Sequence, residues 1–268
     1  MVRTLAGFGP AYFEDFVLPQ FYGAARVDRG DDEALAAALD DPIVALRLFL
    51  RSYAFARRGK DRQPLSDAAS GALKRAVEAN GPDALLKGED GEAVWDFFVE
   101  ECAEQRIKPM EQLNRGVVQG MVELAQEVYR LPDQPSICTW IRVAIENRGE
   151  LALLFERIVD IRGVGPKTAS CFLRDVVAVF DLEEDIPNVD RLIMQPIDRW
   201  VRSITLRYAP DIHDEDPVDW VLAGKAYRLA RLAEVGGIDY NMGCTWFGLK
   251  QVRRPELLDA ALRAVERD

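Results

Sequence analysis

The chain has 268 residues, of which 49% are hydrophobic and 29% are charged, so it can bury the core of one large domain or of two closely joined lobes. No run of roughly 20 apolar residues could cross a bilayer, and the start lacks the apolar stretch of a secretory signal. We therefore expect a cytoplasmic protein with no membrane partner. Thirty-four Lys and Arg against 45 Asp and Glu give a formal charge of −11, which excludes a broadly basic surface for nucleic acid but allows one local basic face.

Apolar residues recur at three- and four-residue spacing along most of the chain, for example at Ile43, Leu46, Phe49 and Leu50. This spacing is typical of amphipathic helices, and the alternating β-branched runs of strands are scarce. The sequence therefore predicts an all-α fold. The expected helices cover residues 32–40, 42–57, 66–79, 91–106, 113–130, 136–147, 149–159, 166–179, 191–204, 217–234 and 255–266.

Capping residues support several of these boundaries. Asp41-Pro42 and Asp216-Pro217 place a carboxylate before a proline at the first helical position. Gly59, Gly81 and Gly149 stand where helices are expected to end. Helical periodicity is interrupted at residues 88–91, 131–135 and 181–185, which are candidate linkers between lobes.

Two groups of basic residues could each supply a local phosphate-binding face. The groups are Arg57, Arg58, Lys60 and Arg62, and Arg199, Arg202 and Arg207. Each group could equally be an ordinary solvated helix face, so neither settles whether the chain binds nucleic acid.

The sequence favours neither a metal nor another cofactor. Cys102, Cys138, Cys171 and Cys244 lie far apart without a C-x-x-C pair, so we expect free thiols and no iron–sulfur loop. His213 is the single histidine, and we interpret it as a solvated loop residue, because a zinc hydrolase would need further ligands.

The most informative segment is residues 153–173, whose pattern predicts a helix, a glycine turn and a second helix. Gly163 and Gly165 give the turn backbone freedom and leave no side chain between the main chain and a ligand. Pro166 then starts the second helix, where free N–H groups would point outward together. Such a turn can bind one phosphate group, although a plain helix end would show similar glycines.

With its apolar positions, this segment resembles the helix-hairpin-helix of the endonuclease III and 8-oxoguanine glycosylase superfamily. The resemblance covers residues 153–202 and treats the remainder as a helical surround. It implies a two-lobed helical fold in which the hairpin lobe, 89–186, faces a lobe built from 1–88 and 187–268. It also implies that Gly163, Val164, Gly165 and Lys167 contact DNA phosphate.

In the lyase-competent members of that superfamily a lysine stands two residues after the second glycine, as Lys167 does here. The chain has seven lysines and 27 arginines, so a lysine at this position is informative. Arginine cannot lose its proton to become a nucleophile, whereas a partly desolvated lysine can. The alternative is a phosphate-contacting or solvated lysine at a helix start.

The segment 185–193 resembles the superfamily's loop that carries the catalytic aspartate, and the match falls on Asp190. We expect a helix N-terminus after Asp190 to keep its carboxylate ionised; a plain N-cap is the alternative. The stretch from Lys167 to Asp190 is longer than usual, and Leu192 replaces a polar residue. Pro196 should kink the expected helix or mark a later start.

Four further residues are candidates for a pocket that holds an everted base. Cys171 follows Lys167 by four residues, so both project from one helix face, and a cysteine at this offset lines the base pocket in 8-oxoguanine glycosylases. Asn241, Trp246 and Phe247 could stack on or hydrogen-bond a base. All four would also be ordinary core residues of helices.

The resemblance implies a monomeric, bifunctional DNA glycosylase and AP lyase of base excision repair, acting without a cofactor on duplex DNA that contains a damaged base. Lys167 would attack the sugar C1′ with help from Asp190 and form a Schiff base. The Lys167 and Cys171 pair favours 8-oxoguanine as the lesion. Two alternatives remain: a non-catalytic helix-hairpin-helix DNA-binding module, and a helical protein-interaction domain.

Overall fold

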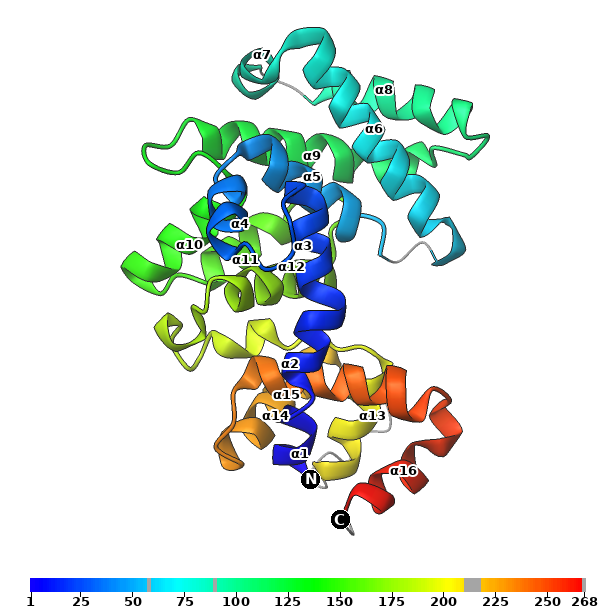
Figure 1. The fold of residues 1–268 in the computed structure, drawn as a ribbon, viewed down its shortest axis with the longest axis vertical. Coiled ribbons are helices and arrows are strands. Elements are labelled where there is room, and N and C mark those ends of the chain that lie inside the picture. The colour runs from blue at the N-terminus through cyan, green and yellow to red at the C-terminus, as the bar shows by residue number, and fades with distance from the viewer. Residues whose placement is uncertain (57–58, 89–90, 210–217, 267–268) are drawn as a thin grey trace. The chain divides into compact units, whose positions relative to one another are not determined.

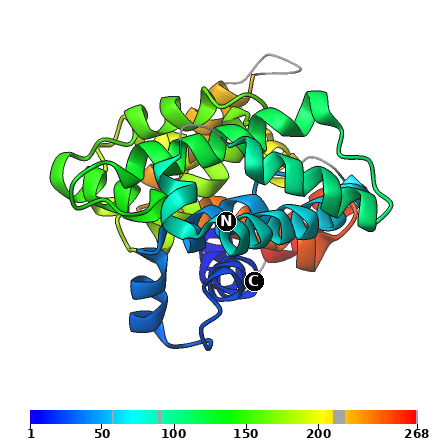
Figure 2. The same ribbon diagram turned by 90° about the horizontal axis from the view of Figure 1, so that it is seen from above.

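The computed structural model describes residues 1–56, 59–88, 91–209 and 218–266. About 76% of the chain is helical and no strand occurs in these ranges, which confirms the all-α fold (Figure 1 and Figure 2). None of the described helices is long and apolar enough to span a membrane.

Contacts divide the chain into two compact units. Unit 1 comprises residues 1–18 and 173–268, and unit 2 comprises residues 19–172. The sequence placed its lobe boundaries after residues 88 and 186, whereas this division falls after Leu18 and Phe172. The second division point lies inside the helix α12 (Pro166–Val179), a position that sequence periodicity cannot reveal because the helical pattern continues through it.

Unit 2 is a group of helices that pack through aromatic and aliphatic side chains. Phe172 from the first half of α12 contacts Phe49 and Tyr53 edge-on, with ring centroids 5.0 and 5.2 Å apart. Phe55 and Phe98 stack at 5.8 Å. Besides the start of α12, the α-helices of unit 2 are α3 (Leu18–Ala25), α4 (Asp32–Leu39), α5 (Pro42–Ser52), α6 (Arg62–Asn80), α7 (Pro82–Lys87), α8 (Glu92–Glu104), α9 (Glu111–Tyr129), α10 (Ile137–Arg148) and α11 (Ala152–Val159).

Helix ends in unit 2 follow the expected caps at three places. The Asp41 carboxylate accepts hydrogen bonds from the N–H groups of Ile43 and Val44 at 2.7 and 3.1 Å, as predicted for a helix that begins at Pro42. Gly81 and Gly149 follow α6 and α10 with φ of 80° and 64°, a region that disfavours other residues. The helix expected to reach residue 57 ends at Ser52, whose carbonyl accepts from Arg62 at 2.9 Å.

Unit 1 has a core around the buried side chains of Trp200, Tyr240 and Phe247. Gly243 and Gly248 allow close packing here, because an added Cβ would lie 1.8 Å from the Leu5 carbonyl oxygen and 2.2 Å from the Trp200 ring, respectively. The α-helices of unit 1 are α1 (Val2–Ala6), α2 (Gly9–Tyr12), the second half of α12, α13 (Arg199–Tyr208), α14 (Asp219–Leu232), α15 (Gly237–Trp246) and α16 (Leu258–Val265).

The predicted helix over 191–204 is wrong in its first half. The chain forms a short 3-10 turn, η4 (Arg191–Met194), and α13 begins only at Arg199. Pro196 explains the break, because a proline ring cannot donate the internal hydrogen bond and excludes the carbonyl of the preceding turn. The later helix start that Pro196 suggested is therefore confirmed, and Asp198 provides its N-cap.

Candidate functional site

The six-residue connection 160–165 joins α11 to α12 in unit 2. Gly163 adopts φ of 94°, and the N–H of Val164 donates to the Ile161 carbonyl at 2.9 Å, which closes the turn. The Gly165 carbonyl then accepts from Thr168 and Ala169 at 2.9 and 3.1 Å, so α12 begins directly after it. The exact bounds predicted for the helix 166–179 are confirmed.

Two glycines of α9 hold this connection close to the helix. An added Cβ at Gly116 would lie 2.8 Å from the Arg162 carbonyl oxygen, and one at Gly120 would lie 2.6 Å from Cγ2 of Ile161. At Gly163 an added Cβ would meet Cγ2 of Val117 at 2.6 Å. The turn therefore rests against α9 with no room for extra side chains. The G-x-x-x-G spacing of Gly116 and Gly120 is the sequence signal that could have predicted this contact.

Three main-chain donors at the turn stay available. Among the residues that the structure describes, the N–H groups of Gly163, Gly165 and Lys167 make no hydrogen bond. Val164 differs, because its N–H is used inside the turn and its side chain is 5% exposed. The predicted phosphate contact thus has three donors rather than four.

Lys167 lies half-buried in the first turn of α12. Within the described ranges its ammonium group makes neither a hydrogen bond nor an ion pair. Cys171 is half-buried one turn later on the same helix.

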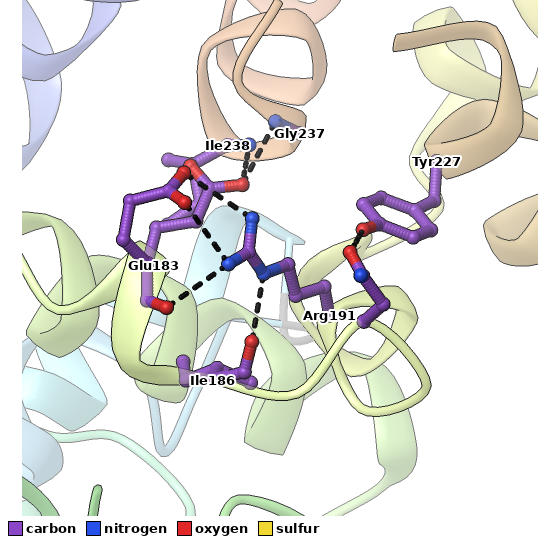
Figure 3. A network of polar contacts seen from close by, with 8 residues as sticks. Glu183, Ile186, Arg191, Tyr227, Gly237 and Ile238 are labelled. Carbon is purple, nitrogen blue, oxygen red and sulfur yellow. Dashed lines mark hydrogen bonds and ion pairs between the residues drawn. The ribbon is translucent and has the colours of Figure 1, made fainter. Parts of the chain in front are cut away.

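In unit 1, the guanidinium group of Arg191 fixes the loop that leads to Asp190 (Figure 3). Nε donates to the Ile186 carbonyl at 2.8 Å, and Nη2 donates to the Glu184 carbonyl at 3.1 Å. The Glu184 carboxylate pairs with both Nη atoms of Arg191 at 3.2 Å. The Asn188 side chain accepts from the Tyr227 hydroxyl at 2.6 Å, which attaches the middle of the loop to α14.

Glu183 connects the start of the same loop to α15. Its Oε1 accepts from the N–H groups of Gly237 and Ile238 at 2.8 and 3.3 Å (Figure 3). Burial raises the pKa of this carboxyl above its ordinary value of 4.5, while the two N–H donors and the Arg191 charge act in the opposite direction. The loop is therefore fixed at its start, its middle and its end.

Asp190 does not have the helix N-terminus that the sequence predicted for it. It precedes η4, makes no side-chain capping bond, and is half-buried. Asp198 holds the true N-cap, because its Oδ1 accepts from the N–H groups of Trp200 and Val201 at 2.8 Å and its Oδ2 from Thr245 Oγ1 at 3.0 Å. Within the described residues the Asp190 carboxylate makes no hydrogen bond or ion pair. Lys167 belongs to unit 2 and Asp190 to unit 1, so their pairing stays a prediction.

The C-terminal base-pocket candidates lie on α15 and just beyond it. Asn241 is fully buried, accepts from Arg174 Nη1 at 2.8 Å and donates to the Pro196 carbonyl at 3.3 Å. Trp246 stacks on Phe8 at 4.9 Å and donates to Asp15 at 3.2 Å. Phe247 is 1% exposed. That these residues contact a base stays a prediction. To do so, Asn241 and Trp246 would have to give up the contacts described above.

The second group of basic residues is largely neutralised by carboxylates of unit 1. Arg202 pairs with Asp219 at 2.6 Å, and Arg207 pairs with Asp259 at 3.4 Å. Arg199 lies over the Trp200 ring at 4.7 Å. In the first group, Arg57 and Arg58 lie outside the described residues, as does the side chain of Lys60. Asp216-Pro217 and His213 also lie outside them.

None of the four cysteines forms a disulfide. Burial raises the pKa of the Cys102 thiol to about 11 and that of Cys138 to about 12, and it also raises that of Cys244. These three thiols are therefore protonated at neutral pH and weak nucleophiles. The described part of the chain holds no group of three or more His, Cys, Asp or Glu side chains that could bind a metal.

No protein-family model, curated protein sequence or solved structure matches this chain. The residues of the 160–165 turn and of the loop before Asp190 are therefore the features that indicate a function.

Proposed function

We propose that the chain is a bifunctional DNA glycosylase and AP lyase that removes a damaged base from duplex DNA in the cytoplasm, without a cofactor. The observation that carries the proposal is the half-buried Lys167, whose ammonium group has no partner among the described residues. Its own main-chain N–H and those of Gly163 and Gly165 are unused by the protein. N–H groups that converge at a helix start favour a phosphate, and an amine next to them would stand close to the sugar of that nucleotide.

In the proposed reaction, the neutral amine of Lys167 attacks C1′ of the damaged nucleotide. A C–N bond forms, the glycosidic bond breaks, and the base leaves with the bonding electron pair and takes up a proton. The amine adduct opens the sugar ring to a Schiff base. Loss of a proton from C2′ then breaks the C3′–O bond and releases the 3′ phosphate. Asp190 would accept the lysine proton or stabilise the positive charge that develops on the sugar.

Borohydride reduction during turnover tests the proposal, because it converts the Schiff base into a stable link between protein and DNA. We expect trapping of the wild-type chain on lesion-containing duplex and none for Lys167→Ala. Lys167→Arg is the matched control: it keeps the positive charge but cannot form a Schiff base, so it should bind the duplex and remain untrapped. Equal trapping of all three proteins would refute the role of Lys167.

The same assay separates the alternatives. Salt-sensitive duplex binding without trapping on any lesion would indicate a non-catalytic DNA-binding module. The lack of salt-sensitive binding would favour a protein-interaction domain. Across a panel of lesions we expect 8-oxoguanine to be excised fastest, and faster excision of thymine glycol or 3-methyladenine would refute that substrate.

A further inference from the structure

An open groove of about 620 Å³ lies in unit 1 beside the loop that carries Asp190. Its walls are the loop residues Asn188 and Val189 and the outer face of α14, including Gly224, Tyr227, Arg228 and Arg231. The hydrogen bond between Asn188 and Tyr227 joins the two walls at 2.6 Å. Val189 precedes Asp190 directly, so the groove borders the loop that carries the proposed catalytic aspartate.

The charge of the groove is opposite to that of the chain as a whole. Two arginines line it, and none of the described lining residues is a carboxylate, although the formal charge of the chain is −11. Arg231 is exposed and makes no ion pair within the described ranges. Most arginines of unit 1 for which contacts are described are paired with carboxylates, for example Arg191 and Arg202.

The groove also offers apolar surface. Val189 and Leu232 are 73% and 72% exposed, and Tyr227 also lines the groove. Gly224 leaves the helix backbone uncovered, since an added Cβ there would have no atom within 4 Å. A guanidinium group can bind phosphate in a bidentate manner, and apolar side chains suit the sugar faces of a strand.

We infer that this α14 groove binds the sugar-phosphate backbone of the DNA strand adjacent to the nucleotide at Asp190. The inference rests on the proposed function, because it assigns the groove to the same damaged strand. Arg231 supplies the phosphate contact, and Gly224 leaves room for the strand against the helix.

Fluorescence anisotropy with a labelled duplex, measured at several salt concentrations, tests the inference. Arg231→Gln should weaken binding several-fold and reduce the slope of log K against log salt by about 0.9, the value for one lost phosphate contact. Gly224→Gln should weaken binding by filling the groove, without disturbing the packing of α14. Arg263→Gln, at an exposed and unpaired arginine of α16, and Gly224→Ala are the controls and should bind like wild type.

The outcomes separate this inference from the proposed function. If the wild type is trapped on lesion DNA but Arg231→Gln and Gly224→Gln bind with unchanged affinity and slope, the groove assignment is refuted and the glycosylase proposal stands. If both variants bind more weakly but nothing is trapped, the groove assignment stands and the lysine chemistry fails. Wild-type protein that does not bind DNA refutes both. Self-association that Gly224→Gln abolishes, with unchanged DNA binding, would assign the groove to a second copy of the chain and refute the inference.

Discussion

The two residues proposed to react differ in how the surrounding residues hold them. Lys167 lies in a helix whose start is fixed by Gly165, whereas Asp190 stands in a loop that Arg191, Asn188 and Glu183 attach to its neighbours. A reactive group works best when the residues around it limit its motion. Arg191 is therefore a positioning residue for Asp190 in the proposed reaction.

Asp190→Asn should lower the single-turnover rate of base release by about 100-fold or more, because it removes a proton acceptor and a negative charge. Duplex affinity and the free energy of unfolding should stay close to wild type, since the Asp190 carboxylate makes no hydrogen bond or ion pair among the described residues. Full activity of Asp190→Asn would show that this carboxylate has no part in the chemistry.

Glu183 gives the loop a dependence on pH. Its pKa is higher in the folded chain than its ordinary value of 4.5, so the folded state binds this proton more tightly. The bound proton therefore stabilises the folded chain fully at pH values below about 4.5, the pKa in the unfolded chain. This stabilisation is lost as the pH rises through the higher pKa of the folded chain. Asp239 adds to the upward shift, and Arg191 opposes it.

Glu183→Gln should remove this pH-dependent loss of stability, because glutamine does not titrate. Its side-chain oxygen can still accept the hydrogen bond from the Gly237 N–H. The free energy of unfolding of the variant, minus that of wild type, should therefore increase with pH above about 4.5 and then level off. Urea unfolding at a series of pH values measures this difference. A difference that stays constant over the same range would contradict the shift.

Among the elements, α13 depends on the N-cap Asp198, eight positions after Asp190, where the sequence predicted the helix start. Asp198→Ala removes two hydrogen bonds to main-chain N–H groups and should lower the free energy of unfolding by about 1 kcal/mol. Asp198→Asn keeps a capping oxygen and should therefore lower the free energy of unfolding clearly less than Asp198→Ala does. Urea unfolding of both variants tests this, and equal losses would show that the charge rather than the cap matters.

The 160–165 turn depends on Gly163 for both conformation and space. A non-glycine residue with a positive φ costs roughly 1–2 kcal/mol of stability. Gly163→Ala should destabilise the chain by more than this, because its Cβ would also lie only 2.6 Å from Cγ2 of Val117. Gly30 is the matched control, since it has the same φ of 94° with no atom within 4 Å of an added Cβ. Gly163→Ala should therefore unfold at lower urea concentration than Gly30→Ala, and equal midpoints would rule out the packing contribution.

At the scale of the whole molecule, ion pairs within the protein already use part of the basic charge. Ion pairs hold Arg75, Arg115, Arg157, Arg174, Arg191, Arg202 and Arg207. The turn and the α14 groove are the two places proposed to contact phosphate, so a shallow salt dependence should accompany duplex binding. We expect log K to fall with log salt with a slope of about −2 to −3, as two or three phosphate contacts would give. A much steeper slope would require a basic surface beyond the turn and the α14 groove.

The sequence by itself determined the helical class, most helix bounds and the turn between α11 and α12. These features depend on neighbours within a few positions: apolar spacing, Asp41 before Pro42, and glycines with a positive φ. Pro196 also marked the break before α13, because its effect is local.

Only the tertiary structure decided which of the candidate groups are available. Arg202 and Arg207 are neutralised by carboxylates 17 and 52 positions further along the chain. The amide of Asn241 is used by Arg174, and the close contact of the 160–165 turn with Gly116 and Gly120 joins distant segments. Partners this far apart in sequence leave no periodic signal, because they are set by how helices pack rather than by local backbone preference. Hence the sequence named Lys167 and Asp190, and the folded chain determined that their side chains are left without a partner within the described residues.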